Sequence, residues 1–163
     1  MNYRVGIGFD IHRLESDASP NAGLMIGGVR VPCAYRVIAH SDGDVLLHAL
    51  CDALLGAVAA GDLGEHFSDS DPTHRGRDSA WFVGRVLALP QLAGWRLANI
   101  DANIITEVPR LMTHKPSIRA RVAELLRLPL DAIGIKARSH EGMDAVGEKR
   151  AISAQAVVLL EKT

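Results

Sequence analysis

The 163-residue chain has few cysteines, no excess of charge and no long hydrophobic run. Cys33 and Cys51 are too few for a disulfide framework and lack metal-site spacing, which favours a reducing cytoplasm. Lys plus Arg number 18 against 19 Asp plus Glu, so the basic excess of a nucleic-acid binder is missing. No apolar run approaches the roughly 18–20 residues that cross a bilayer, and the first ten residues show no targeting pattern. We therefore expect neither a nucleic acid nor a membrane as partner.

Aromatic residues are also scarce, whereas histidines are not: the chain has three Phe, two Trp and two Tyr beside seven His. Its length suffices for one domain that closes a core. No repeat, low-complexity tract or long linker interrupts the sequence. We therefore expect a single domain over residues 1–163.

Four segments have the alternating or β-branched pattern of strands, namely residues 3–12, 95–106, 133–138 and 152–160. The last is nearly continuous in apolar residues, which predicts burial on both faces. Two short apolar runs flank Gly27-Gly28 and predict a small hairpin.

Helical periodicity is clearest from Asp42 to Ala60, where Leu and Ala recur at helical spacing. Ser41 or Asp42 can cap the start of this helix and Gly61 can end it. Further helices are predicted from Asp78 and Pro116. Because strands and helices interleave, the sequence predicts a layered α/β or α+β sandwich.

Two groups of side chains point to a divalent metal. Asp10 and His12 lie two apart on the first strand and therefore share a face. On the helix, His48 falls on a polar stripe with Ser41, Asp44 and Asp52 that contains no Lys, Arg or Glu.

Asp10, His12 and His48 together form a candidate zinc site, because two imidazoles and a carboxylate suit this ion. Three protein ligands leave a fourth position open, which is typical of catalytic zinc. Asp44 or Asp52 could orient one of the metal-binding histidines by a hydrogen bond to its free ring nitrogen.

Three further places could bind a ligand: an anion at the first, a ribose hydroxyl or a cation at the second, and a magnesium ion at the third. His40-Ser41 precede a helix N-terminus, which favours anions, although Ser41 could simply cap the helix. The polar stretch 61–77 is rich in Asp and Gly and long for a plain connection. The run 138–141 follows a strand and ends on Glu141, an oxygen ligand suited to magnesium, although it could be an ordinary polar turn.

Several motifs in order along the chain resemble the 2-C-methyl-D-erythritol 2,4-cyclodiphosphate synthases. They are G-F-D-I-H at 8–12, I-G-G-V at 26–29, A-H-S-D-G-D-V-L-L-H-A-L at 39–50, D-A-L-L-G-A at 52–57, G-D-L-G at 61–64 and F-S-D-S-D-P at 67–72. The His-Ser-Asp-Gly-Asp run followed by His48 is the most specific of them.

The resemblance implies a lyase that converts 4-diphosphocytidyl-2-C-methyl-D-erythritol 2-phosphate to the cyclic diphosphate. Cytidine monophosphate is the leaving group. The reaction belongs to the non-mevalonate route to isoprenoid precursors. It implies a homotrimer with active sites between subunits. Together with the strand and helix pattern, it implies an α+β sandwich whose mixed four-stranded sheet is covered by helices on one side, plus a small hairpin.

The resemblance also assigns roles to residues. Asp10, His12 and His48 would hold zinc, and Glu141 would help to hold magnesium or manganese. His40 and Ser139 match positions that stabilise the transition state. The remaining substrate contacts implied are Asp10, His12, Ser41, Asp62, Leu63, Gly64, Phe67, Ser68, Asp69, Ser70, Asp71, Thr106, Glu107, Val108, Pro109, Arg110, Leu111, Met112, Arg138, His140 and Glu141.

The sequence departs from the family near its C-terminus. Ala145 and Glu148 stand where an aromatic residue and an arginine are usual, at positions that line the central cavity of the trimer. Because an acid repels a diphosphate, we expect this protein to bind isoprenoid diphosphates there weakly or not at all, unless Lys149 or Arg150 substitutes for the arginine. Ser139 stands for a threonine and Arg110 for a lysine.

Two other functions fit the same residues. A metal-dependent phosphohydrolase or phosphodiesterase would use a metal-bound water as nucleophile. A trimeric binding module with a structural metal would need a closed site of four ligands, whereas the sequence offers three.

Overall fold

The computed structural model describes all residues except 1, 69–70, 72 and 74–75. Its strands are β1 (Tyr3–Ser16), β2 (Gly23–Ile26), β3 (Val29–Pro32), β4 (Tyr35–Ile38), β5 (Trp95–Ile105), β6 (Ile133–Arg138) and β7 (Ala151–Lys162). Its helices are α1 (Val45–Ala57), α2 (Leu63–His66), α3 (Ser79–Leu87), α4 (Lys115–Leu126) and α5 (Asp144–Gly147), with 3-10 turns at Pro90–Leu92 and Leu130–Ala132.

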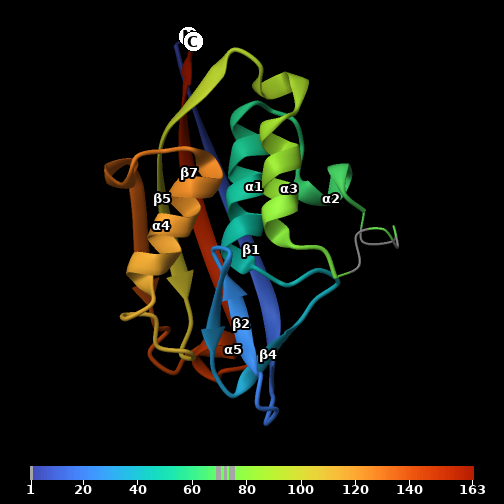
Figure 1. Cartoon of the computed structure of the whole chain (residues 1–163), viewed down its shortest axis with the longest axis vertical. Coiled ribbons are helices and arrows are strands. Elements are labelled where there is room, and N and C mark those ends of the chain that lie inside the picture. The colour runs from blue at the N-terminus through green and yellow to red at the C-terminus, as the bar shows by residue number, and fades with distance from the viewer. Residues whose placement is uncertain (1, 69–70, 72, 74–75) are drawn as a thin grey trace.

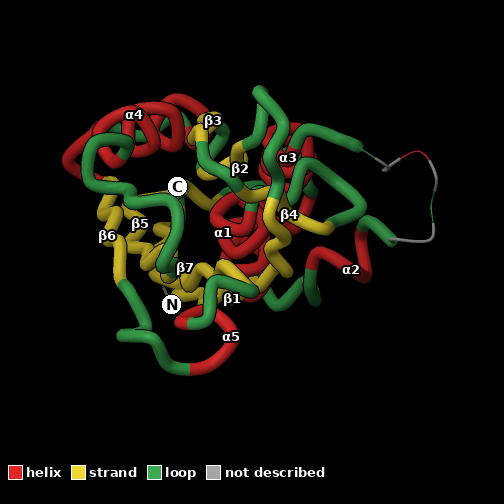
Figure 2. The backbone as a smooth tube through the Cα atoms, turned by 90° about the horizontal axis from the view of Figure 1, so that it is seen from below, coloured by secondary structure: helices red, strands yellow, loops and turns green. Residues whose placement is uncertain are grey.

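The main sheet has the strand order β4-β1-β7-β5-β6, in which β5 and β6 are parallel and the other pairs antiparallel. Helices α1, α3 and α4 cover one face, and β2 and β3 form a separate hairpin beside them (Figures 1 and 2). We call the face under these helices the inner face and the opposite one the outer face. The mixed sheet, its one-sided helical cover and the hairpin confirm the predicted α+β class.

A fifth strand, β4, joins the edge of the sheet beyond the four that were predicted. It pairs with residues 13–16, where β1 continues past His12. A four-residue strand gives little periodic signal, and its partner lies outside the predicted first strand. The C-terminal end of β4 leads through His40 to the start of α1.

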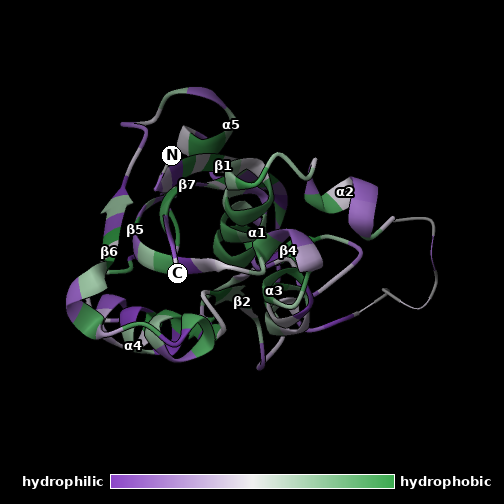
Figure 3. Ribbon diagram, turned by 90° about the horizontal axis from the view of Figure 1, so that it is seen from above, coloured by the Kyte–Doolittle hydropathy of each residue, from purple (hydrophilic) through white to green (hydrophobic). Residues whose placement is uncertain are grey.

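The prediction that β7 is buried on both faces is wrong for the single chain. Ala154, Ala156 and Val158 are buried on the inner face, whereas Gln155 and Val157 on the outer face are exposed. Neighbouring β1 also exposes apolar side chains on this face, with Val5, Ile7 and Phe9 at 66%, 71% and 52% of their full area. The outer face is therefore apolar where β1 and β7 lie. Figure 3 shows α1, α3 and α4 on the other side of the sheet, and short α5 on the outer side.

Glycines on β1 let α1 lie unusually close to the sheet. A Cβ built on Gly8 would come within 2.0 Å of the Ala49 carbonyl oxygen, and one on Gly6 within 1.9 Å of that of Ala53. These contacts lie far below van der Waals distance, so the helix backbone rests directly on the strand. As a result, side chains from β1 and α1 can meet across a short gap.

Replacing Gly8 by alanine should therefore destabilise the protein by about 3 kcal/mol, since neither backbone can move aside without repacking the core. Gly84→Ala on α3 is the matched control, because an added Cβ there meets no atom within 4 Å. Alanine is also the better helix former at that position, so this control should stabilise slightly. Urea unfolding measures both; equal stabilities of the two variants would contradict the close approach.

No helix in the described part of the chain combines the length and the apolar character needed to cross a membrane.

Candidate active site

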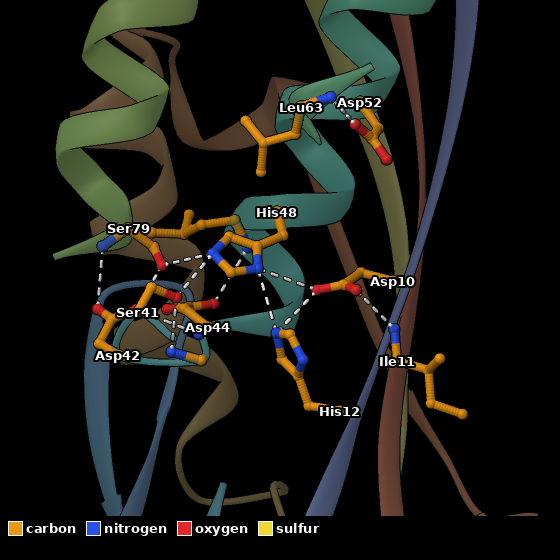
Figure 4. Close-up of polar contacts among 12 residues, drawn as sticks. Asp10, Ile11, His12, Ser41, Asp42, Asp44, His48, Asp52, Leu63 and Ser79 are labelled. Carbon is orange, nitrogen blue, oxygen red and sulfur yellow. Dashed lines mark hydrogen bonds and ion pairs between the residues drawn. The ribbon is translucent and has the colours of Figure 1, made fainter. Parts of the chain in front are cut away.

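The close approach of β1 and α1 brings Asp10, His12 and His48 together (Figure 4). Asp10 Oδ2 lies 3.0 Å from both His12 Nε2 and His48 Nδ1. The two ring nitrogens are 3.1 Å apart. The side chains of Asp10 and His12 project from the inner face of β1, and His48 lies on the first turn of α1. This confirms the predicted meeting of strand and helix.

The geometry of these three donor atoms fits a divalent metal. A tetrahedral ion with ligands at about 2.0–2.1 Å requires ligand atoms roughly 3.3 Å apart, close to the spacing observed. Two imidazoles and a carboxylate are the donor types that zinc prefers. Among the described residues, this is the one group of three such side chains gathered closely enough for a metal. The group supplies three donors, so the structural-metal alternative lacks the fourth ligand that a closed site needs.

The charges of the three groups depend on one another. Burial works against the charged form of Asp10, but hydrogen bonds from His12 and His48 hold its pKa well below the usual range. Burial likewise lowers the pKa of His48, but the hydrogen bond to Asp10 and the charge of Asp10 outweigh it and raise this pKa. The carboxylate is thus ionised and ready to serve as a ligand.

The polar stripe expected on the helix is only half present. The helix begins at Val45 and ends at Ala57, so Ser41 and Asp44 precede it and the angular argument does not apply to them. Asp44 is the N-cap: its carboxylate accepts hydrogen bonds from the backbone N–H groups of Leu47, Gly27 and Gly28 at 3.1, 2.8 and 2.6 Å. It therefore fastens the hairpin to α1 rather than orienting a metal ligand, and burial raises its pKa.

Asp52 does lie on the same side of α1 as His48, but it does not contact that ring. Its Oδ1 accepts a hydrogen bond from the backbone N–H of Leu63 at 2.8 Å, which ties α2 to α1. Burial raises the pKa of its carboxyl group. The prediction that Asp44 or Asp52 orients a metal ligand from behind is therefore wrong in this structure.

A cavity of about 380 Å³ opens beside the metal cluster. Predicted site residues from four segments line it, namely Asp10, His12, His40, Ser41, His48, Asp62, Leu63, Gly64 and Phe67, together with Asp52. Short helix α2, which the sequence did not predict, carries Leu63 and Gly64 behind the N-cap Asp62. Ser68 and Asp71 follow in the same stretch without lining the cavity, and Asp69 and Ser70 lie outside the described residues.

A second hollow, of about 470 Å³, is lined by three of the four predicted residues at 138–141; Glu141 is not among its lining residues. Arg138, Ser139 and His140 line it beside Lys136, Asn103 and Gln155. The adjacent Ser139 hydroxyl donates a hydrogen bond to Glu141. Glu107 accepts hydrogen bonds from the backbone N–H groups of His140 at 2.9 Å and Gly142 at 3.5 Å, so it joins the two predicted nucleotide segments.

The other predicted residues of segment 106–112 differ in solvent exposure. Thr106 and Leu111 are buried, and Arg110 and Met112 are exposed. The Thr106 hydroxyl donates to the carbonyl of Val108, which precedes a cis bond to Pro109. Arg110 and Met112 are thus the side chains of this segment that are open to a ligand.

The two hollows lie on opposite faces of the sheet. Asp10 pairs with buried Ala154, whereas Phe9 pairs with exposed Gln155 in the second hollow. Successive strand residues point to opposite faces, so the metal cluster faces inward and the Arg138–His140 hollow outward. One chain therefore does not bring its two sets of predicted site residues together.

Three residues around the metal cluster escaped the sequence analysis. Phe82 on α3 lines the cavity and packs edge-on against the His48 ring, with the two ring centroids 6.1 Å apart. Ser79 and Asp42 lie behind His48 and are linked to it by hydrogen bonds. Nothing in the sequence relates Ser79 and Phe82 to residues more than 30 positions earlier; Asp42, in the His-Ser-Asp-Gly-Asp run, was the one available signal.

Comparisons with known proteins identify the relatives of this chain. The model of the YgbB family matches residues 3–161. The 2-C-methyl-D-erythritol 2,4-cyclodiphosphate synthase of Chromohalobacter salexigens is 48% identical over 163 residues, covering 100% of this chain and 98% of the relative.

Solved structures agree with this relationship. A 2C-methyl-D-erythritol-2,4-cyclodiphosphate synthase in a CDP-bound form superposes with a TM-score of 0.87 at 37% identity, covering 97% of this chain and 100% of the other. IspF of Plasmodium falciparum in a CDP complex gives a TM-score of 0.85 at 30% identity, covering 99% and 97%.

Proposed function

Because the chain belongs to the YgbB family, we propose that it is an enzyme that converts 4-diphosphocytidyl-2-C-methyl-D-erythritol 2-phosphate to 2-C-methyl-D-erythritol 2,4-cyclodiphosphate. One synthase domain spans residues 1–163, and the class of reaction is that of a phosphorus–oxygen lyase in the non-mevalonate pathway. The observation that carries the proposal is the Asp10–His12–His48 cluster at the wall of a cavity lined by the predicted substrate segments.

In this reaction an oxygen of the 2-phosphate forms a bond to the β-phosphorus, and the bond from that phosphorus to the bridging oxygen breaks. Cytidine monophosphate leaves with the bridging oxygen and its electron pair. The nucleophile belongs to the substrate, so the chain needs no activated serine or cysteine. Accordingly, burial strongly raises the pKa of the Cys51 thiol, which keeps it protonated in the core.

The work left to the protein is to hold two anionic groups together against their repulsion. Zinc held by Asp10, His12 and His48, and magnesium or manganese held with the help of Glu141, would supply positive charge to the phosphates. His40 and Ser41 precede the N-terminus of α1, where the helix dipole favours an anion. Phe67, which also lines the cavity, presents an apolar surface for the methylerythritol carbons.

We further propose that the active enzyme is a homotrimer with each site between two subunits. The exposed apolar side chains of Val5, Ile7 and Phe9 support contact of the outer face with another copy. The two hollows on opposite faces support it independently, because a metal half and a nucleotide half can meet only across a subunit boundary. The same contact would explain why β7 reads as buried on both faces. Free cysteines agree with a reducing cytoplasm as the proposed compartment.

The C-terminal departures predict that isoprenoid diphosphates bind poorly. Glu148 is exposed, and its carboxylate accepts a hydrogen bond from Arg150 Nε at 2.7 Å, so this nearby cation is already paired. Geranyl diphosphate added at submillimolar concentration should give no saturable heat in calorimetry. Glu148→Arg should gain binding, because it removes an acid and adds a phosphate ligand. Tight binding to the unaltered chain would contradict this prediction.

The proposed activity is tested by incubating the purified chain with the diphosphocytidyl substrate, zinc and magnesium. Cyclic diphosphate and cytidine monophosphate should form in equal amounts. Formation of neither product by metal-loaded, folded protein would refute the proposal.

A further inference from the structure

Behind the metal cluster, a chain of hydrogen bonds runs from His48 to α3 and back to the segment before α1 (Figure 4). His48 Nε2 lies 2.9 Å from Ser79 Oγ and 3.3 Å from Ser41 Oγ. The Ser79 hydroxyl donates to Asp42 Oδ1, and the Ser79 backbone N–H donates to Asp42 Oδ2 at 3.0 Å. Ser79 is fully buried, so no solvent competes for these bonds.

The order of donors and acceptors in this chain is fixed by chemistry. An ionised carboxylate only accepts hydrogen bonds, so Asp42 obliges the Ser79 hydroxyl to donate its single proton to it. The lone pairs of Ser79 Oγ are then left to face His48. Because Ser79 Oγ is the nearer of the two hydroxyl oxygens, Nε2 carries the proton of that contact. When the ring is neutral, as metal binding requires, its lone pair is therefore on Nδ1, the atom that donates to Asp10 while the ring is protonated.

These hydrogen bonds also connect the start of α3 with the segment that precedes α1. Ser79 is the first residue of α3 and Asp42 lies just before α1, and they are joined a second time where Asp42 N–H donates to the Arg77 carbonyl at 3.0 Å. Gly76 N–H likewise donates to the His40 carbonyl at 2.7 Å. The end of the 61–77 stretch is therefore held against the same turn that leads to His48.

We propose that Ser79 and Asp42 are positioning residues for His48, fixing its Nε2-protonated tautomer and ring orientation so that the Asp10–His12–His48 site binds a divalent metal tightly. This inference rests on the proposed metal site and adds the two residues that orient one of its ligands. Metal-bound histidines commonly donate their second ring N–H to a carboxylate or another acceptor, and removing that acceptor typically weakens metal affinity. Here a serine transmits the effect of the carboxylate.

The test is the zinc dissociation constant of the metal-stripped full-length chain, measured by competition with a chromophoric chelator. Ser79→Ala should weaken zinc binding by about 10–100-fold. Ser79→Thr keeps the hydroxyl and should recover most of the affinity. Asp42→Asn should weaken binding as well, because its amide N–H₂ would turn the Ser79 proton toward Nε2 and place the ring proton on Nδ1.

Asp78→Ala is the matched control at the neighbouring position. It removes the N-cap bond to the Ala80 N–H at 2.8 Å and loosens the start of α3 without touching His48. This variant should lower the melting temperature and leave the zinc affinity unchanged. Absorption of bound Co²⁺ supplies a second readout, since its visible bands should shift in Ser79→Ala and not in Asp78→Ala.

Each outcome is decisive. Equal zinc affinity of Ser79→Ala and the unaltered chain would overturn the inference, as would an equal loss in Asp78→Ala, which would indicate a merely structural role. If Ser79→Ala fails to fold, Asp42→Asn decides alone. Failure of the unaltered chain to bind one zinc would instead refute the metal site itself, which keeps the two proposals distinguishable.

Discussion

Replacing His48 by asparagine is expected to lower kcat/KM about a thousandfold while the chain stays folded, since losing one of three metal ligands forfeits several kcal/mol of charge stabilisation. Asparagine is close in size to the proximal part of the imidazole and can still form hydrogen bonds, so the partly buried position at the start of α1 should tolerate it. The loss should appear mainly in kcat, because most substrate contacts lie on other segments. Steady-state kinetics with zinc and magnesium in excess measures it.

His114→Asn is the control for this variant. His114 precedes α4, lines neither hollow and makes no side-chain cap bond, so the same exchange there should leave kinetics unchanged. Circular dichroism and the melting temperature of both variants separate loss of the site from loss of the fold. Full turnover by folded His48→Asn would remove this histidine, and the metal it is proposed to hold, from the reaction.

Activity should return when two inactive variants are combined. A chain with His48→Asn lacks the metal half of the site, and a chain with Glu141→Gln lacks a ligand in the nucleotide half. If each site takes one half from each of two subunits, a randomly mixed trimer of equal amounts rebuilds about a quarter of the sites with both halves intact. Specific activity should therefore rise from near zero toward about a quarter of that of the unaltered enzyme.

Mixing must occur within assemblies, so the two chains are co-refolded and carry tags of different mass that native mass spectrometry can count. Each variant refolded with itself is the control and should stay inactive. Mixed assemblies that stay as inactive as their parents would show that each site lies within one chain. That result would contradict the argument from the opposite faces of the sheet.

Short-range periodicities predicted the two parts of the metal cluster separately. Period two placed Asp10 and His12 on one face of a strand, and His48 fell on the polar side of the clearest helix. What joins them is the close approach at Gly6 and Gly8, where the carbonyl oxygens of α1 occupy the space of a side chain. That contact lies between segments some 40 residues apart, and no local pattern encodes it.

The errors have equally local causes. Asp44 was placed by the angular spacing of a helix that starts only after it, so its carboxylate caps the backbone and faces the hairpin. The continuous apolar character of β7 predicted burial on both faces within one chain. In the structure α5 covers only one end of the outer face and leaves Gln155 and Val157 exposed. Ser79 could not be assigned because its role depends on the packing of α3 against α1.

The account is tested most directly by the reaction of the purified chain with the diphosphocytidyl substrate, zinc and magnesium in water enriched in ¹⁸O. Attack by the 2-phosphate of the substrate predicts a cyclic diphosphate and cytidine monophosphate, neither containing solvent oxygen. A metal-dependent hydrolase would instead release an open phosphate labelled with ¹⁸O. Labelled, uncyclised product would contradict the proposed function, even if the same three residues bind the metal.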